Sequence, residues 1–424
     1  MILICIFSFT TLVLSYLMNK SLLNPITFFI LYWTIQFVLT LILIPNNSNL
    51  QLSGYYYIIS IFLIMILADF IVKYYLCENR YNYCNNQKFQ IQNVDFKYLK
   101  LAIISSIILG MLYLVLKLKE SGANIGTLFN LDELAKIVNK ISVQRYAGEE
   151  KNSMIAQILL TFIYLPPCFA GLLLALKPFK RYQIYLILCF IPSLLVCLVQ
   201  STRSIVLSNL CCFLGVYISF SLFKYGKDFK LLKFKNLILL LLGIVLFIGL
   251  FSFAQMLRGG KVKEFNDVLN SSMIENIKIY VSGHVPAFST WFENYKASDL
   301  SFGAYTFASI FNILGLKYRE LGIYRDYVYL FEDRGTNIYT YFRGFIQDFG
   351  VLFSYIIFLI LGAIGSLSYH KIMKKKFKYI LLLILFYIIT LFFPSSFLNY
   401  TTHILSLMLF FIYLLFAYNR DSVL

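Results

Sequence analysis

The sequence is poor in charged residues: Asp, Glu, Lys and Arg make up only 13% of its 424 residues. Water-soluble domains carry about 25%, so a soluble globular protein is excluded. The chain has only three histidines, and its eight cysteines show none of the spacings of a metal site. We therefore expect no metal, no cofactor and no disulfide. The N-terminus lacks a basic segment and a small-residue cleavage site, which indicates a first membrane span rather than a cleaved signal.

Apolar residues, in contrast, are abundant: 60% of the chain is hydrophobic and its mean hydropathy is +0.75. Many apolar runs approach the length of about 20 residues that a helix needs to cross a bilayer, and the alternation of a membrane barrel is not visible. We predict an all-α, polytopic membrane protein that forms a single domain over 1–424, with about eleven transmembrane helices. The expected spans are 1–18, 25–44, 54–72, 98–116, 154–176, 182–200, 204–223, 236–257, 350–369, 379–394 and 401–418.

The net charge of +17 would by itself suggest a protein that binds nucleic acid. The positions of the basic residues in the sequence give another explanation. Basic residues gather in the short loops 177–181, 224–235 and 370–378. Because cytoplasmic loops are enriched in Lys and Arg, we place these loops inside, the N-terminus outside and the C-terminus in the cytoplasm. The charge is then mostly a topology signal, and we expect no nucleic-acid partner.

Most of the polar mass falls in one outer loop, 258–349, for which we expect several short helices. Helical spacing of apolar residues indicates a helix within 271–292 and an amphipathic helix within 302–318. Thr336 is a candidate N-cap for a helix that leads into the span at 350–369. The second outer loop, 117–153, contains a predicted amphipathic helix at 127–142.

Three arginines lie close to a predicted membrane boundary on the outer side. Arg203 sits in "STRS" between two spans, Arg258 ends a span in "QMLRGGK", and Arg343 precedes a span in "YFRGFIQDF". Arginine binds phosphate in a bidentate manner, and clustered arginines repel one another unless an anion joins them. A lipid-linked diphosphate presents its phosphates at this depth. The alternatives are interfacial arginines bound to lipid phosphate, and for Arg343 an ion pair with Asp348 or Glu332.

Further candidate binding residues lie on the same predicted side. They are Arg145 in the loop 117–153, and Tyr280, Asn337, Tyr339 and Asp348 in the large loop. Tyrosine combines a flat apolar face with a hydroxyl, which suits a saccharide, although aromatic belts are also typical of membrane proteins in general. His284, in "YVSGHVPAF", is either a catalytic residue or a structural one.

"STRSIVL" opening a span, "YVSGHVPAF" in the large loop and "NIYTYFRGFIQDFG" leading into the next span occur in this order on one predicted face. Together with the span pattern, they resemble the bacterial oligosaccharide repeat-unit polymerases, the Wzy-type O-antigen and capsule polymerases. The motifs cover about thirty residues, and the topology covers most of the chain.

The resemblance implies a GT-C-like glycosyltransferase of the bacterial inner membrane. Such an enzyme transfers a growing glycan from undecaprenyl diphosphate onto an incoming undecaprenyl-diphosphate-linked unit, on the outer face. By the same likeness, Arg203 and Arg258 would neutralise the leaving diphosphate and His284 would be the general base. Membrane lipids, a chain-length regulator and a flippase are implied partners.

Other readings remain open. An O-antigen ligase, or another lipid-linked glycosyltransferase, differs only in its acceptor. A repeat-unit flippase would need charges within its spans, and a membrane acyltransferase would need a catalytic histidine, for which His403 is the candidate.

Overall fold

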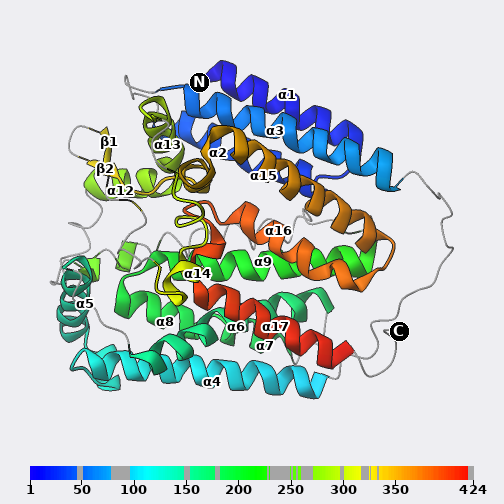
Figure 1. The fold of residues 1–424 in the computed structure, drawn as a ribbon. Helices are drawn as coiled ribbons and strands as arrows, with labels where there is room; N and C mark the ends of the chain where they lie inside the picture. The colour runs from blue at the N-terminus through cyan, green and yellow to red at the C-terminus, as the bar shows by residue number, and fades with distance from the viewer. Residues whose placement is uncertain are drawn as a thin grey trace. The chain divides into compact units, whose positions relative to one another are not determined.

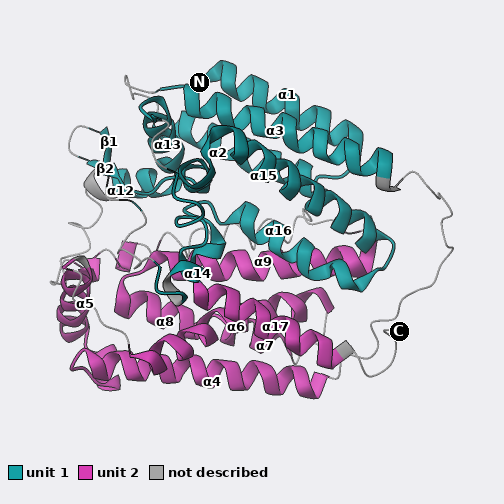
Figure 2. Ribbon diagram, viewed as in Figure 1, with its two compact units in different colours: residues 1–88, 274–400 teal, residues 89–273, 401–424 magenta. Residues whose placement is uncertain are grey.

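A computed structural model gives the fold, shown in Figure 1. It describes residues 1–44, 51–77, 96–147, 153–176, 182–226, 229, 249, 252–254, 256–258, 271–296, 300–316, 324, 326–331 and 334–418. The chain forms two compact units, coloured in Figure 2. Unit 1 comprises residues 1–88 and 274–400, and unit 2 comprises residues 89–273 and 401–424.

Membrane-spanning helices dominate both units. In the described parts of the chain, eight helices are long and apolar enough to cross a membrane, and two shorter apolar helices lie at Phe377–Leu391 and Thr401–Ala417. These ten coincide with ten of the eleven predicted spans. The predicted span 236–257 falls mostly outside the described residues. The prediction of an all-α, polytopic membrane protein is confirmed at this level.

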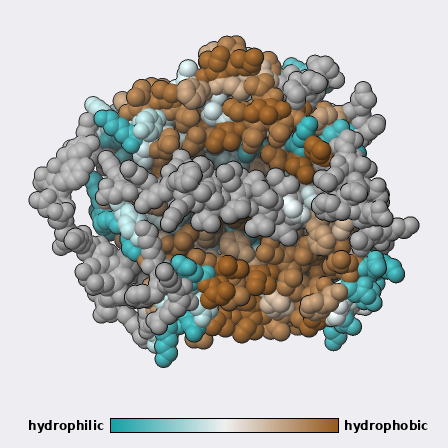
Figure 3. All heavy atoms as spheres, turned by 180° about the vertical axis from the view of Figure 1, so that it is seen from behind, coloured by the Kyte–Doolittle hydropathy of each residue, from teal (hydrophilic) through white to brown (hydrophobic). Residues whose placement is uncertain are grey.

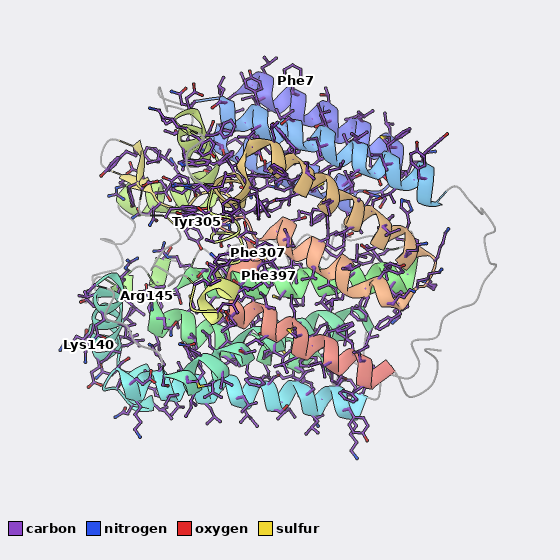
Figure 4. The ribbon with its side chains drawn as sticks, viewed as in Figure 1. Phe7, Lys140, Arg145, Tyr305, Phe307 and Phe397 are labelled. Carbon is purple, nitrogen blue, oxygen red and sulfur yellow. The ribbon has the colours of Figure 1, made fainter. Side chains whose placement is uncertain are left out.

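The first helix of the chain shows why these helices belong in lipid. Helix α1, Ile2–Asn19, buries Ser8, Thr11 and Ser15, whereas Phe7 is 46% exposed and is labelled in Figure 4. A helix in water would do the reverse. Small and polar residues between helices with apolar residues outside are typical of a bilayer. Accordingly, most of the described surface in Figure 3 is hydrophobic.

Unit 1 is a helical bundle with a cap, formed by its described residues within 271–340. Its long helices are α1, α2 (Pro25–Leu43), α3 (Ser53–Ile71), α15 (Tyr341–Met373) and α16 (Ile380–Leu391). Asn24 begins α2 by accepting hydrogen bonds from the amides of Ile26 and Thr27, and a π-helical turn, Val72–Cys77, continues α3. Near the end of α3, Asp69 forms an ion pair with Lys73 at 2.8 Å and accepts a hydrogen bond from Ser366.

The cap departs from the predicted short helices in several places. The expected helix in 271–292 is divided into α12 (Ser271–Ser282) and α13 (His284–Glu293). A Cβ on the intervening Gly283 would lie 2.4 Å from the carbonyl oxygen of Ile279, so only glycine fits there. In 302–318 the described residues form only the short helix α14, Ala308–Ile313.

A β-hairpin stands where a helix cap was expected. Strands β1 (Val328–Phe331) and β2 (Arg334–Thr336) pair antiparallel, so Thr336 is a strand residue and the N-cap prediction is wrong. Helix α15 instead begins after Thr340 and changes direction at Gly350, whose φ of 76° is left-handed. The first helical segment of α15 therefore leads into the span through a glycine.

Unit 2 contains α4 (Phe96–Glu120), α5 (Leu131–Tyr146), α6 (Met154–Leu176), α7 (Gln183–Leu188), α8 (Ile191–Gln200), α9 (Arg203–Tyr225) and α17 (Thr401–Tyr418). Helices α6 and α9 touch at Gly171, where a Cβ would lie 2.4 Å from the carbonyl oxygen of Phe213. Pro167, inside α6, cannot donate a helical hydrogen bond to the carbonyl of Ile163. The side-chain amide of Asn209 on α9 donates to that carbonyl instead, at 3.2 Å.

Helix α5 of unit 2 begins a few residues later than predicted. Asn130 caps α5 by accepting a hydrogen bond from the Glu133 amide, so the helix occupies Leu131–Tyr146 rather than the predicted 127–142. Residues Ile125–Phe129 form a separate 3₁₀ turn, capped by Asn124.

Candidate functional site

Arg203 is the first residue of α9, at a sharp turn between two spans. Ser201, with φ of 51°, ends α8 in the left-handed region, and Thr202 in extended conformation begins α9. The side chain of Arg203 is half-buried. The start of a helix carries partial positive charge and backbone amides without helical partners, so Arg203 and the α9 N-terminus both favour an anion.

Hydrogen bonds connect this turn to α5 and to the segment that contains Ala254, and they also connect α5 to Arg258. Arg145 on α5 donates through Nη1 to the carbonyl oxygen of Gln200, at 2.9 Å. The hydroxyl of Ser201 donates to the carbonyl oxygen of Ala254, at 3.3 Å. Asn139, also on α5, donates to the carbonyl oxygen of Arg258, at 2.8 Å. The chain segments that carry Arg145, Arg203 and Arg258 are thus connected, and we call these three residues the arginine cluster.

A single apolar core holds these segments in place. It contains Val138 and Ile141 of α5, Val199 of α8, Ile205 of α9 and Leu257, next to Arg258. All are buried. The backbone segments that carry the three arginines therefore stand on a packed apolar base. Figure 4 labels Arg145 on α5 together with Lys140, which donates to the carbonyl oxygen of Ser121.

Arg343 of unit 1 lies in a cage of aromatic rings. Its guanidinium carbon is 3.9 Å from the ring centre of Tyr324, 4.2 Å from that of Tyr339 and 4.9 Å from that of Trp291. Its Nη2 pairs with Asp326 at 2.5 Å, and its Nε donates to Gln347. With a side chain only 4% exposed, Arg343 is a buried cation that the rings and one carboxylate stabilise.

The carboxylate of Asp348 binds backbone amides and does not pair with Arg343. Its carboxylate accepts hydrogen bonds from the backbone amides of Tyr305 and Thr306 and is fully buried. The partner of Arg343 is Asp326, so the alternative of an Arg343–Asp348 pair is wrong. Asp348 anchors the turn that contains Tyr305, which Figure 4 labels, to α15.

His284 is enclosed in the core of unit 1. Its ring stacks on Phe393 with centroids 4.0 Å apart and meets Trp33 at 6.1 Å. Neither ring nitrogen has a hydrogen-bond partner among the described residues. Burial lowers the pKa of His284 to about 3, so the imidazole is neutral at pH 7. Neutral imidazole is the form that accepts a proton, but the side chain has no exposed surface through which a substrate could reach it.

The remaining predicted binding residues belong to unit 1. Tyr339 forms part of the Arg343 cage, and Asn337 is exposed and donates to the carbonyl oxygen of Tyr324 at 3.4 Å. Tyr280 is half-buried on α12. The structure thus gathers the predicted residues into one set per unit: Arg145, Arg203 and Arg258 in unit 2, and Arg343 with Tyr339 and Asn337 in unit 1.

Sequence reasoning missed Asp326 and Trp291. Both contact Arg343 in the structure but are distant from it in the sequence, and neither belongs to a recognisable motif. The available signal was weak: Asp326 precedes the short run 327–331, YVYLF, whose aromatic and β-branched residues are typical of a strand. Among the described residues, no group of His, Cys, Asp and Glu is arranged to hold a metal ion.

Comparisons with protein-family models, with curated proteins and with solved structures found no match for this chain. The residues and their contacts therefore carry the functional argument.

Proposed function

We propose that this protein polymerises lipid-linked oligosaccharide repeat units at the outer face of the bacterial inner membrane. The observation that carries the proposal is the arginine cluster, in which the segments bearing Arg145, Arg203 and Arg258 are hydrogen-bonded into one assembly beside the start of α9. Three guanidinium groups and a helix N-terminus suit a diphosphate, the charged part of a polyprenyl carrier.

The chemistry requires a cationic site of this kind. A hydroxyl of the incoming unit attacks the anomeric carbon of the growing glycan. The bond from that carbon to the diphosphate oxygen breaks, and the hydroxyl proton passes to a base. Charge develops on the departing undecaprenyl diphosphate, and fixed guanidinium groups stabilise it without rearrangement. The proposed enzyme has a GT-C-like architecture, with the arginine cluster on the outer side.

The test is complementation of a strain that lacks the gene, with surface glycan resolved by length. Arg203→Ala should leave single repeat units and lower the polymerisation rate by about 10²-fold, the typical loss of one preorganised donor to a developing anion. Arg203→Lys should restore part of the activity, because a point charge cannot bind phosphate through two parallel bonds.

Lys136→Ala is a matched control, since Lys136 is an exposed cation on the same helix as Arg145. It should polymerise normally. Long glycan chains of normal abundance in the Arg203→Ala strain would contradict the proposed role of the cluster.

The same deletion distinguishes the alternative readings. Loss of a polymerase leaves one repeat unit on the acceptor, loss of a ligase leaves none, and loss of a flippase strands units inside the cell. His284 is tested separately. If His284→Ala polymerises at full rate, the proton goes to another base.

A further inference from the structure

Two tyrosines at the β-hairpin of unit 1 have exposed side chains. Side chains alternate along a strand, so Leu330 faces inward, where it packs with Ile44 and Ile279. Tyr329 faces outward and is 67% exposed, and Tyr327, two residues earlier, is 54% exposed. Their ring centroids lie 5.6 Å apart, with 60° between the ring planes. The two rings form an exposed aromatic pair on a backbone that is anchored to the core.

A fixed carboxylate adjoins this pair. Asp326 immediately precedes Tyr327, and its side chain is 67% exposed. An aspartate side chain this exposed would ordinarily rotate freely in solvent. Here the Nη2 of Arg343 donates a hydrogen bond to Oδ2 of Asp326 and restricts that rotation. The hydroxyl of Tyr339 also donates to its backbone carbonyl, at 3.1 Å. The second carboxylate oxygen, Oδ1, accepts no hydrogen bond from the described residues and is free to accept one from a ligand.

This combination suits a sugar better than a lipid head group. A pyranose has apolar C–H faces, which stack on aromatic rings, and hydroxyls, which donate to a carboxylate. A lipid phosphate would be repelled by the Asp326 carboxylate, since like charges oppose each other at short range. Arg343 and Tyr339 both donate hydrogen bonds to Asp326 and so fix its position before any ligand binds. This reduces the conformational entropy lost on binding.

We propose that Asp326, Tyr327 and Tyr329 form a glycan-binding subsite for the saccharide of the repeat unit. The inference rests on the proposed function for the identity of the glycan. The arginine cluster would bind the diphosphate, and this separate subsite binds sugar.

The experiment measures binding rather than polymerisation. The full-length protein in lipid nanodiscs is titrated with delipidated oligosaccharide, released by mild acid from the surface polysaccharide of the cells that make this protein. The variants are Tyr327→Ala with Tyr329→Ala, and Asp326→Asn. The matched control is Tyr74→Ala with Tyr75→Ala, which removes another exposed tyrosine pair of unit 1, 53% and 69% exposed with centroids 4.9 Å apart.

We expect the Tyr327/Tyr329 variant to weaken binding by about tenfold or more, which corresponds to about 1.4 kcal/mol shared between two rings. Asp326→Asn should weaken it less, and the Tyr74/Tyr75 control should bind like the wild type. Unchanged binding by the Tyr327/Tyr329 variant overturns the proposal, as does an absence of binding to the wild type. Unchanged glycan binding with weaker association of the variant with anionic vesicles would assign the tyrosines to the lipid interface instead, and also overturns it.

This result is separable from the test of the proposed function. If deletion of the gene leaves chain length unaltered, polymerisation fails as the activity, whereas glycan binding by the purified protein still decides the subsite. If Arg203→Ala abolishes polymerisation but the Tyr327/Tyr329 variant binds glycan normally, the subsite alone fails.

Discussion

The Arg343 cage allows the contributions of its rings and of its ion pair to be separated. The guanidinium lies within 5 Å of three ring centres, at 3.9, 4.2 and 4.9 Å. A cation–π contact contributes about 0.5–2 kcal/mol, more when desolvated. The ion pair with Asp326 contributes about 1 kcal/mol or less, because that carboxylate is 67% exposed and solvent screens it. Arg343→Ala should therefore lower the free energy of unfolding by about 2–4 kcal/mol, and Asp326→Asn by about 1 kcal/mol or less.

The chain offers a local probe for this comparison. Its only two tryptophans are Trp33 and Trp291, and Trp291 contacts Arg343. In a Trp33→Phe background, the fluorescence of Trp291 in the detergent-solubilised protein reports unfolding of the cage as denaturant is added. The midpoint should shift strongly for Arg343→Ala and little for Asp326→Asn. Equal shifts would show that the ion pair, and not the ring contacts, stabilises the buried cation, and the reasoning would be refuted.

Two further predictions concern buried polar groups. Asn209→Leu should destabilise unit 2 by about 1–3 kcal/mol because it leaves the Ile163 carbonyl without a donor; thermal unfolding in detergent measures this, and an unchanged midpoint would contradict it. Burial lowers the pKa of His284 from 6.5 to about 3, so between these values the unfolded chain binds a proton that the folded chain does not. Stability should then fall by about 2 kcal/mol from pH 7 to pH 5 on account of this residue; His284→Phe should remove that part of the pH dependence, and identical pH profiles of variant and wild type would count against it.

The spans were predictable because their cause is local. A bilayer demands a minimum length of apolar helix, and that length is visible in any window of the sequence. The pair of Asp69 and Lys73 was equally visible, since residues four apart on a helix are neighbours. The turn containing Arg203 was predictable for the same reason: the five polar residues 200–204 between two apolar runs leave little choice of position.

The structure of the long loop 258–349 was harder to predict because contacts between residues distant in sequence determine it. The segment around Tyr305 is apolar enough for a helix, but the buried Asp348 carboxylate, more than forty residues away, takes up its backbone amides and holds it as a turn. Asp326 reaches Arg343 only because a hairpin folds between them, and no periodicity reports that pairing. From the sequence, Arg203 and Arg258 were grouped with Arg343, whereas in the structure hydrogen bonds connect their segments to α5, which carries Arg145. Helix α5 was predicted as a helix but not as the support of these segments.

Pro167, one of two prolines in α6, has a consequence for how the chain is assembled. Until α9 arrives, the Ile163 carbonyl would face hydrocarbon without a donor, and a bilayer offers no water to replace it. Helix α6 inserted alone would therefore carry an unsatisfied carbonyl at a cost in free energy, and Asn209 removes this cost once α9 packs against it. Biogenesis of this region is accordingly expected to favour insertion of α6 and α9 as neighbours over insertion one helix at a time.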